Sequence, residues 1–203
     1  MLERICTVFT DVLIKKGIVK EEEKEVYVYG SMLSLTTFLG MLSIILISLL
    51  FKWYFGFLFL IIYTPLRVYA GGYHCNTYLS CFIVTNIVFV LNVCFVMLLG
   101  AMSVLGYTVV TAFVLGLSYI YILLNAPIVG RENPLSSKRK AKNRKRSIVV
   151  ASVLVILAIL LRVFGSENLY AQEVYFIITS AELTVSVLMN IQKIKERRTV
   201  KNA

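Results

Sequence analysis

The chain has 203 residues, of which 59% are hydrophobic and 16% are charged, and its mean hydropathy is +0.81. Soluble domains are roughly 45–50% apolar, so this composition excludes an ordinary soluble enzyme and indicates a polytopic α-helical membrane protein. The formal net charge of +10 does not indicate nucleic-acid binding, because the chain has no separate basic soluble domain and no base-stacking pattern. We expect one membrane-embedded domain over residues 1–203, without a cofactor or a nucleic-acid partner.

The N-terminal residues 1–16 form an amphipathic pattern in which apolar residues recur at helical spacing, opposite charged ones. The apolar set is Leu2, Ile5, Cys6, Phe9, Val12 and Leu13. The pattern predicts a helix that lies along the bilayer surface and ends at Gly17. The charged stretch 20–25 is expected to be solvated, so residues 1–30 form a cytoplasmic or interfacial segment.

Six apolar runs follow, each close to the ~20 residues that a helix needs to cross a bilayer. They cover residues 31–51, 53–70, 79–101, 104–125, 148–164 and 174–191. The predicted fold class is therefore all-α, a transmembrane bundle of about six helices within residues 31–191. A four-helix version with interfacial segments remains an alternative. Residues 192–203 are expected to form a basic cytoplasmic tail.

The distribution of basic residues predicts the orientation of the chain. If the N-terminus is cytoplasmic and six helices alternate, 19 of the 21 Lys and Arg residues fall on the inner side. Only Lys52 and Arg162 fall near the outer face. By the positive-inside rule we expect a multi-pass protein of the cell membrane with both termini in the cytoplasm. The segment from Arg67 to Cys81 is then cytoplasmic.

This segment, RVYAGGYHCNTYLSC, holds the only histidine, His74, and two of the four cysteines. On one continuous helix His74 and Cys81 would stand about 10 Å apart, which is too far for a hydrogen bond. The chain must therefore break between them if they are to act together. Gly71 and Gly72 allow a sharp bend that brings the imidazole back.

Asn76 and Thr77 are candidate N-cap residues for a helix that begins at Tyr78. Cys81 would then lie in the first turns of that helix, where the positive dipole end favours a thiolate. Arg67 adds positive potential or holds a substrate carboxylate. The group that orients the imidazole and the oxyanion donors stay unassigned.

A structural role for the lone histidine and the cysteines is the competing interpretation, because free cysteine is often a small buried hydrophobe. Cys6 and Cys94 are expected to serve packing in this way, and Cys75 competes with Cys81 for the role of nucleophile. A zinc site is disfavoured, since no second histidine completes a familiar ligand spacing. Two embedded polar residues, Asn86 and Glu182, are functional candidates, although pairing of Glu182 with another helix is an equal alternative.

The basic stretch 138–146, KRKAKNRKR, is predicted to be a loop. Lys138, Arg139 and Lys140 begin it, and two roles for the stretch are compatible. It binds anionic lipid at about 1 kcal/mol per basic residue, and it captures an acidic peptide.

The motif R-x-x-A-G-G-x-H from Arg67 to His74, with Cys81 seven residues later, resembles the AgrB family of membrane endopeptidases in Gram-positive quorum sensing. The length and the basic segment between the fourth and fifth apolar runs agree with that resemblance. It implies that His74 and Cys81 are the catalytic pair and that Arg67 and Gly72 are functionally sensitive. Gly71, Asn76 and the first basic residues of 138–146 are expected to support the site or bind substrate.

The resemblance also implies a substrate, the short precursor AgrD, which has an amphipathic leader, a central signal segment and an acidic tail. Cleavage between signal and tail would be coupled to formation of a thiolactone ring. Other expected partners are membrane lipids, and packing through small residues is compatible with a homodimer. The alternative function is a small membrane carrier that exports a peptide without cleaving it. The chain shows no internal repeat and no nucleotide-binding motif to support that alternative.

Overall fold

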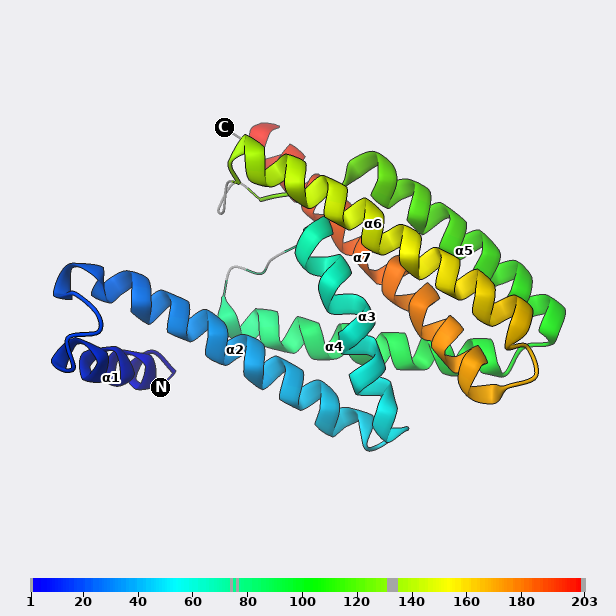
Figure 1. Cartoon of the computed structure of the whole chain (residues 1–203), viewed down its shortest axis with the longest axis horizontal. Helices are drawn as coiled ribbons and strands as arrows, with labels where there is room; N and C mark the ends of the chain where they lie inside the picture. The colour runs from blue at the N-terminus through cyan, green and yellow to red at the C-terminus, as the bar shows by residue number, and fades with distance from the viewer. Residues whose placement is uncertain (1, 74, 76, 131–134, 202–203) are drawn as a thin grey trace. The chain divides into compact units, whose positions relative to one another are not determined.

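The structure is a computed structural model of the chain, and it describes residues 2–73, 75, 77–130 and 135–201. Over these residues the chain is built from helices, which Figure 1 shows in chain order. They are α1 (Leu2–Lys15), the short 3₁₀ helix η1 (Glu21–Glu23), α2 (Lys24–Ser48), α3 (Trp53–Ala70), α4 (Tyr78–Gly100), α5 (Val104–Asn125), α6 (Ser137–Phe164) and α7 (Leu169–Lys201). Six helices in the described part of the chain are long and apolar enough to cross a membrane, which confirms the predicted all-α polytopic fold.

The helix boundaries agree with the predicted spans where the apolar run and the helix end together. α3 and α5 cover the predicted residues 53–70 and 104–125, and α4 begins one residue before the predicted 79. α2, α6 and α7 instead continue into charged sequence beyond their apolar runs. Hydropathy identifies only the part of a helix that can lie within a bilayer. The helices continue beyond that part because Lys, Arg and Glu have high helix propensity.

The prediction of a loop over residues 138–146 is wrong, because this basic stretch forms the first turns of α6. Ser136 caps the helix, since its side-chain oxygen accepts a hydrogen bond from the N–H of Arg139 at 3.4 Å. Residues 193–201, predicted as part of a tail, likewise continue α7.

The chain divides into two compact units, and the first comprises residues 1–44 and 75–86. Its helix α1 confirms the predicted amphipathic segment, and Gly17, at φ +70°, follows it. Lys24 at the start of α2 pairs with Asp11 of α1 at 2.7 Å. Ser43 of α2 donates to the side-chain oxygen of Asn86 in α4 at 2.8 Å, so Asn86 connects two helices of this unit.

The second unit comprises residues 45–74 and 87–203, and α7 is its central helix. α3, α5 and α6 all pack on α7, and Figure 1 shows α5, α6 and α7 side by side. Thr111 of α5 hydrogen-bonds to Tyr175, and Ser118 accepts from Ser186 at 3.4 Å, so α5 and α7 run parallel. Close approach of α6 is possible because it buries small side chains, including Ala151 and Ala158.

Glu182 lies within this packed helix and is fully buried. Neither of its carboxylate oxygens has a hydrogen-bond partner among the described residues, so the pairing considered for it is not seen there. Unpaired buried carboxylates are costly in an apolar interior.

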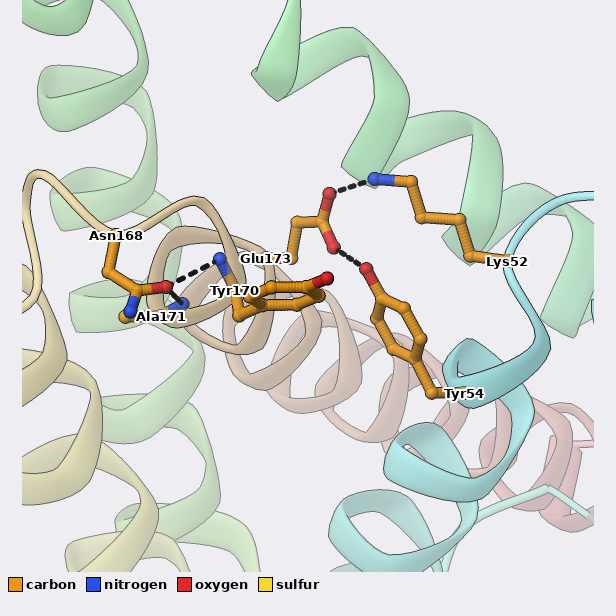
Figure 2. A network of polar contacts seen from close by, with 6 residues as sticks. All are labelled: Lys52, Tyr54, Asn168, Tyr170, Ala171 and Glu173. Atoms are coloured by element: carbon orange, nitrogen blue, oxygen red, sulfur yellow. Dashed lines mark hydrogen bonds and ion pairs between the residues drawn. The ribbon is translucent and has the colours of Figure 1, made fainter.

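A polar network ties the start of α3 to the start of α7 (Figure 2). Lys52 and the hydroxyl of Tyr54 both donate to the carboxylate of Glu173. Asn168 caps α7 by accepting from the N–H of Tyr170 at 2.9 Å, and the ring of Tyr170 lies 5.8 Å from that of Tyr54. Together these contacts fix the relative position of the two helix starts, beside a cavity of about 600 Å³.

Candidate functional site

The turn that follows α3 is built from two glycines with positive φ, Gly71 at +77° and Gly72 at +123°. This backbone region favours glycine, because a Cβ clashes there with the main chain. A Cβ on Gly71 would lie 2.0 Å from the carbonyl oxygen of Ile128. A Cβ on Gly72 would lie 2.8 Å from Nη1 of Arg67 and 3.2 Å from the carbonyl carbon of Leu188. The predicted sharp bend is therefore present, and both positions exclude a side chain.

The same turn is joined to the segment that follows α5. Gly71 and Ile128 form an isolated parallel β-bridge. The N–H of Gly72 donates to the oxygen of Ile128 at 3.1 Å, and the N–H of Ile128 donates to the oxygen of Ala70 at 3.0 Å. These bonds satisfy main-chain groups that the end of a helix leaves unpaired, and they fix two loops against each other.

Tyr73, the residue immediately before the histidine, is held at three points. Its N–H donates to the oxygen of Leu188 in α7 at 3.0 Å. Its carbonyl oxygen accepts from Nη2 of Arg67, and the ammonium group of Lys195 lies 5.5 Å from its ring centroid. The guanidinium of Arg67, predicted to provide positive potential or to hold a carboxylate, thus holds the main chain that leads to His74.

His74 and Asn76, two of the predicted site residues, lie outside the described residues, so the predictions made for them stay predictions. Tyr73 on one side and Cys75, which is half-buried, on the other are described.

Cys81 lies in α4, which begins at Tyr78 as predicted. Thr77 caps this helix: its carbonyl oxygen accepts from the N–H of Cys81 at 3.0 Å, and its hydroxyl accepts from the N–H of Ser80 at 3.2 Å. The predicted cap at this residue is confirmed. The thiol of Cys81 is half-buried and stands one turn from the positive end of the helix dipole.

The remaining cysteines differ in their surroundings. Cys6 is only 2% exposed in α1, in agreement with a packing role. The prediction that Cys94 also serves packing is wrong, because its side chain is exposed on α4. α4 is apolar on all sides, so its sequence does not reveal which face turns to lipid.

A basic surface lies at the same end of the second unit as the glycine turn. Lys138, Arg139 and Lys140 are exposed in the first turn of α6. Further along α6 the guanidinium of Arg146 lies 5.3 Å from the ring of Tyr69 near the end of α3, while the C-terminal turns of α7 add Lys195 beside Tyr73. The positive helix N-terminus adds to these charges and favours an anionic ligand.

Two further features bear on ligands. In the first unit, α1 and α2 wall an apolar groove of about 760 Å³, whose lining includes Ile5, Phe9, Val26, Leu35 and Phe38.

No group of three His, Cys, Asp or Glu side chains that would hold a metal ion is found among the residues that the structure describes.

The arrangement defines a class of protein: a polytopic helical membrane protein whose anchored glycine turn leads to its only histidine, with a cysteine at the start of the following helix. Residues 6–190 match the AgrB family, accessory gene regulator B. The chain therefore belongs to the AgrB family, as the motif resemblance predicted. Membership implies a role in the accessory gene regulator system of quorum sensing and a relationship with an AgrD-like precursor peptide.

An AgrB-like protein of Clostridium perfringens (strain SM101 / Type A) is 22% identical to the chain over 169 residues, which cover 79% of this chain and 77% of the relative. No solved structure matches the chain.

Proposed function

We propose that the chain is an integral-membrane cysteine endopeptidase that cleaves an AgrD-like precursor and closes its signal segment into a thiolactone or lactone ring. The observation that carries the proposal is the anchoring of Tyr73. The guanidinium of Arg67 in α3 and the main-chain oxygen of Leu188 in α7 both bind the backbone of Tyr73, immediately before the only histidine of the chain. A turn that is held so firmly suits a residue whose position matters for chemistry.

In the proposed mechanism the imidazole of His74 takes the proton of the Cys81 thiol, and the sulfur attacks the scissile carbonyl. His74 then returns the proton to the leaving amine of the precursor's tail, and an acyl-enzyme thioester remains. A cysteine or serine side chain within the bound signal segment gives its proton to His74 and attacks this thioester. The bond from the acyl carbon to the sulfur of Cys81 breaks, so the ring closes and Cys81 leaves as the thiolate. Transfer between thioesters is nearly neutral in energy while hydrolysis is downhill, so the site must exclude water, which a lipid-shielded position favours.

The exposed basic residues Lys138, Arg139 and Lys140 are proposed to bind the acidic tail of the precursor. The count of Lys and Arg along the chain supports a cytoplasmic position for this surface, for the site and for both termini. The precursor would then be processed from the inner face of the cell membrane.

Co-expression of the chain with its AgrD-like precursor tests the proposal. Cys81→Ala should abolish cleavage at an unchanged protein level, whereas Cys75→Ala and Cys94→Ala, at an exposed position of α4, should still process the precursor. Mass spectrometry of the wild-type protein should find a precursor-derived acyl adduct on Cys81. Equal processing by Cys81→Ala would refute the peptidase and favour a carrier that exports an uncleaved peptide.

A further inference from the structure

The cavity of about 600 Å³ beside the pair of Lys52 and Glu173 takes no part in the proposed reaction. It lies where α3 and α7 begin and α4 ends, whereas the glycine turn follows the other end of α3. At 1.5 Å per residue, the 18 residues of α3 separate the two places by about 27 Å. A cavity of this volume with mainly apolar walls and a few polar groups is typical of a ligand site.

The lining of the cavity combines apolar walls with two opposite charges. The charged lining residues are Lys52 and Glu173, which bind each other. The large apolar side chains of the lining are Leu50, Phe51, Phe55, Val96, Met97 and Phe176. Such walls suit a hydrocarbon chain, and the charged pair suits a polar head group. The ligand that fits both is an amphiphile.

The cavity lies at the level of a bilayer surface. The helices α3, α4 and α7, whose ends surround it, are each long and apolar enough to cross a membrane. Trp53 and Tyr170, at the first or second position of α3 and α7, are 66% and 68% exposed. Trp and Tyr are enriched at the membrane–water interface. A lipid head group would therefore meet the charged pair at its own depth in the bilayer.

The charged pair has bonding capacity for such a head group. Figure 2 shows the carboxylate of Glu173 between the ammonium of Lys52 and the hydroxyl of Tyr54, with one hydrogen bond to each oxygen. An ammonium group has three N–H donors and a carboxylate has about four lone-pair sites, so both groups can bind a further partner. The side chain of Lys52 is 49% exposed, which leaves its ammonium accessible.

We propose that this cavity binds one phospholipid whose head group carries both a phosphate and a primary ammonium, as in phosphatidylethanolamine. Lys52 donates to the phosphate, the ammonium of the lipid donates to Glu173, and an acyl chain lies against the apolar walls. A purely anionic head group is repelled by the carboxylate of Glu173, and a quaternary ammonium has no N–H to donate. The proposal concerns the end of α3 opposite the glycine turn and does not rest on the proposed function.

The test uses the full chain in detergent, freed of lipid and without precursor. Phosphatidylethanolamine at about 100 times its Kd should raise the thermal midpoint by roughly 5–10 °C, and native mass spectrometry should show one bound lipid. Phosphatidylglycerol and phosphatidylcholine each lose one charge-assisted hydrogen bond and should bind about 10-fold more weakly. Equal binding of all three lipids would overturn the proposal.

Gly100→Leu should abolish the effect by filling the cavity. Gly100 lines the cavity at the end of α4, and no atom lies within 4 Å of a Cβ there, so the new side chain has room to enter. Gly116→Leu is the matched control, since a Cβ on this glycine of α5 also meets no atom and the residue does not line the cavity. Should Gly100→Leu fail to fold, Ala101→Leu at the next lining position repeats the test. Equal lipid binding by the cavity variant and its control would contradict the site.

Glu173→Gln tests the head group. Without the carboxylate the repulsion of an anionic lipid is lost, so the preference for phosphatidylethanolamine over phosphatidylglycerol should disappear. Because the readout is the rise caused by lipid, a lower starting midpoint of this variant does not affect it. A preference as large as that of the wild type would refute the role of Glu173 in the site.

Two further measurements exclude other occupants. Free phosphoethanolamine, which has the same charges and no acyl chains, should not raise the midpoint, and a rise equal to that with the lipid would assign the cavity to a soluble ligand. Native mass spectrometry also distinguishes a lipid from a second copy of the chain. If Gly100→Leu lost a second copy and kept the lipid, the lipid site would be refuted.

Discussion

The main-chain N–H of Tyr73 donates to the carbonyl oxygen of Leu188, an oxygen that belongs to the interior of α7. A carbonyl oxygen has two lone pairs and can serve both its own helix and an outside donor. The turn that leads to His74 is thereby joined to the central helix of its unit.

Replacement of Gly71 should disrupt the turn. In Gly71→Ala the new Cβ would meet the oxygen of Ile128 at 2.0 Å, at a φ that L-residues rarely adopt, so the β-bridge must open. We expect a lower thermal midpoint and a loss of precursor processing of at least about 10-fold, since a shift of ~1 Å can cost 100-fold.

Gly116→Ala is the matched control, because no atom lies within 4 Å of a Cβ at this position in α5. There alanine should be neutral or should stabilise the helix by up to ~1 kcal/mol. Equal behaviour of the two variants in thermal unfolding and processing would contradict the steric account of the turn.

Arg67 should act on turnover rather than on substrate affinity. Its guanidinium holds the carbonyl oxygen of Tyr73, so Arg67→Lys and Arg67→Ala should both lower kcat and leave KM nearly unchanged. Steady-state cleavage of a synthetic precursor measures both constants. A large rise in KM with normal kcat would show instead that Arg67 binds the substrate.

The basic first turn of α6 should act on affinity. The triple variant Lys138→Gln/Arg139→Gln/Lys140→Gln should raise KM for the precursor, and the difference from wild type should shrink as salt screens the charges. The triple variant Lys15→Gln/Lys16→Gln/Lys20→Gln removes equal charge from exposed positions near α1 and should have little effect. Equal KM values for both triple variants would assign the basic turn to lipid binding or topology.

The network around Glu173 should contribute to stability. Glu173→Gln removes the charge that pairs with Lys52 and accepts from Tyr54, at a side chain that is 17% exposed. Because Lys52 is about half exposed, we expect a modest loss of about 1 kcal/mol in the free energy of unfolding in detergent. Lys52→Met should lose a similar amount, and the double variant less than the sum. Glu167→Gln, at an exposed residue before α7, is the control. If the loss in free energy of unfolding of the double variant equals the sum of the two single losses, the two side chains are not coupled.

The sequence predicted most of the fold because long apolar runs leave few alternatives to membrane helices. α3 and α5 were predicted at both ends, since glycine, proline or charged residues follow their apolar runs closely. α6 and α7 extend beyond the predicted spans because helix formation does not stop where the bilayer does. The exposure of Cys94 was not predictable, since a helix that is apolar all round shows no preferred face.

The sequence predicted those parts of the candidate site in which a particular residue type determines the local structure. The glycine pair predicted the bend, and Thr77 predicted the start of α4. The anchors of the turn were missed, because Ile128 and Leu188 act through main-chain oxygens that every residue possesses. The sequence predicts Gln192 at the start of a basic tail, whereas tertiary packing buries it in α7 beside Gly130 of the segment after α5.

Different neighbours leave no room for a side chain at the two glycines. For Gly71 the neighbour is Ile128 after α5, and for Gly72 the neighbours are Arg67 on α3 and Leu188 on α7. The two positions should therefore drift independently during evolution. A relative that replaces the first glycine should show a compensating insertion or deletion after its own fifth helix, whereas one that replaces the second should show altered residues on the last helix. If the segment after the fifth helix or the last helix were exchanged between such relatives, the turn should form only where the exchanged segment leaves room for the residue at the glycine position.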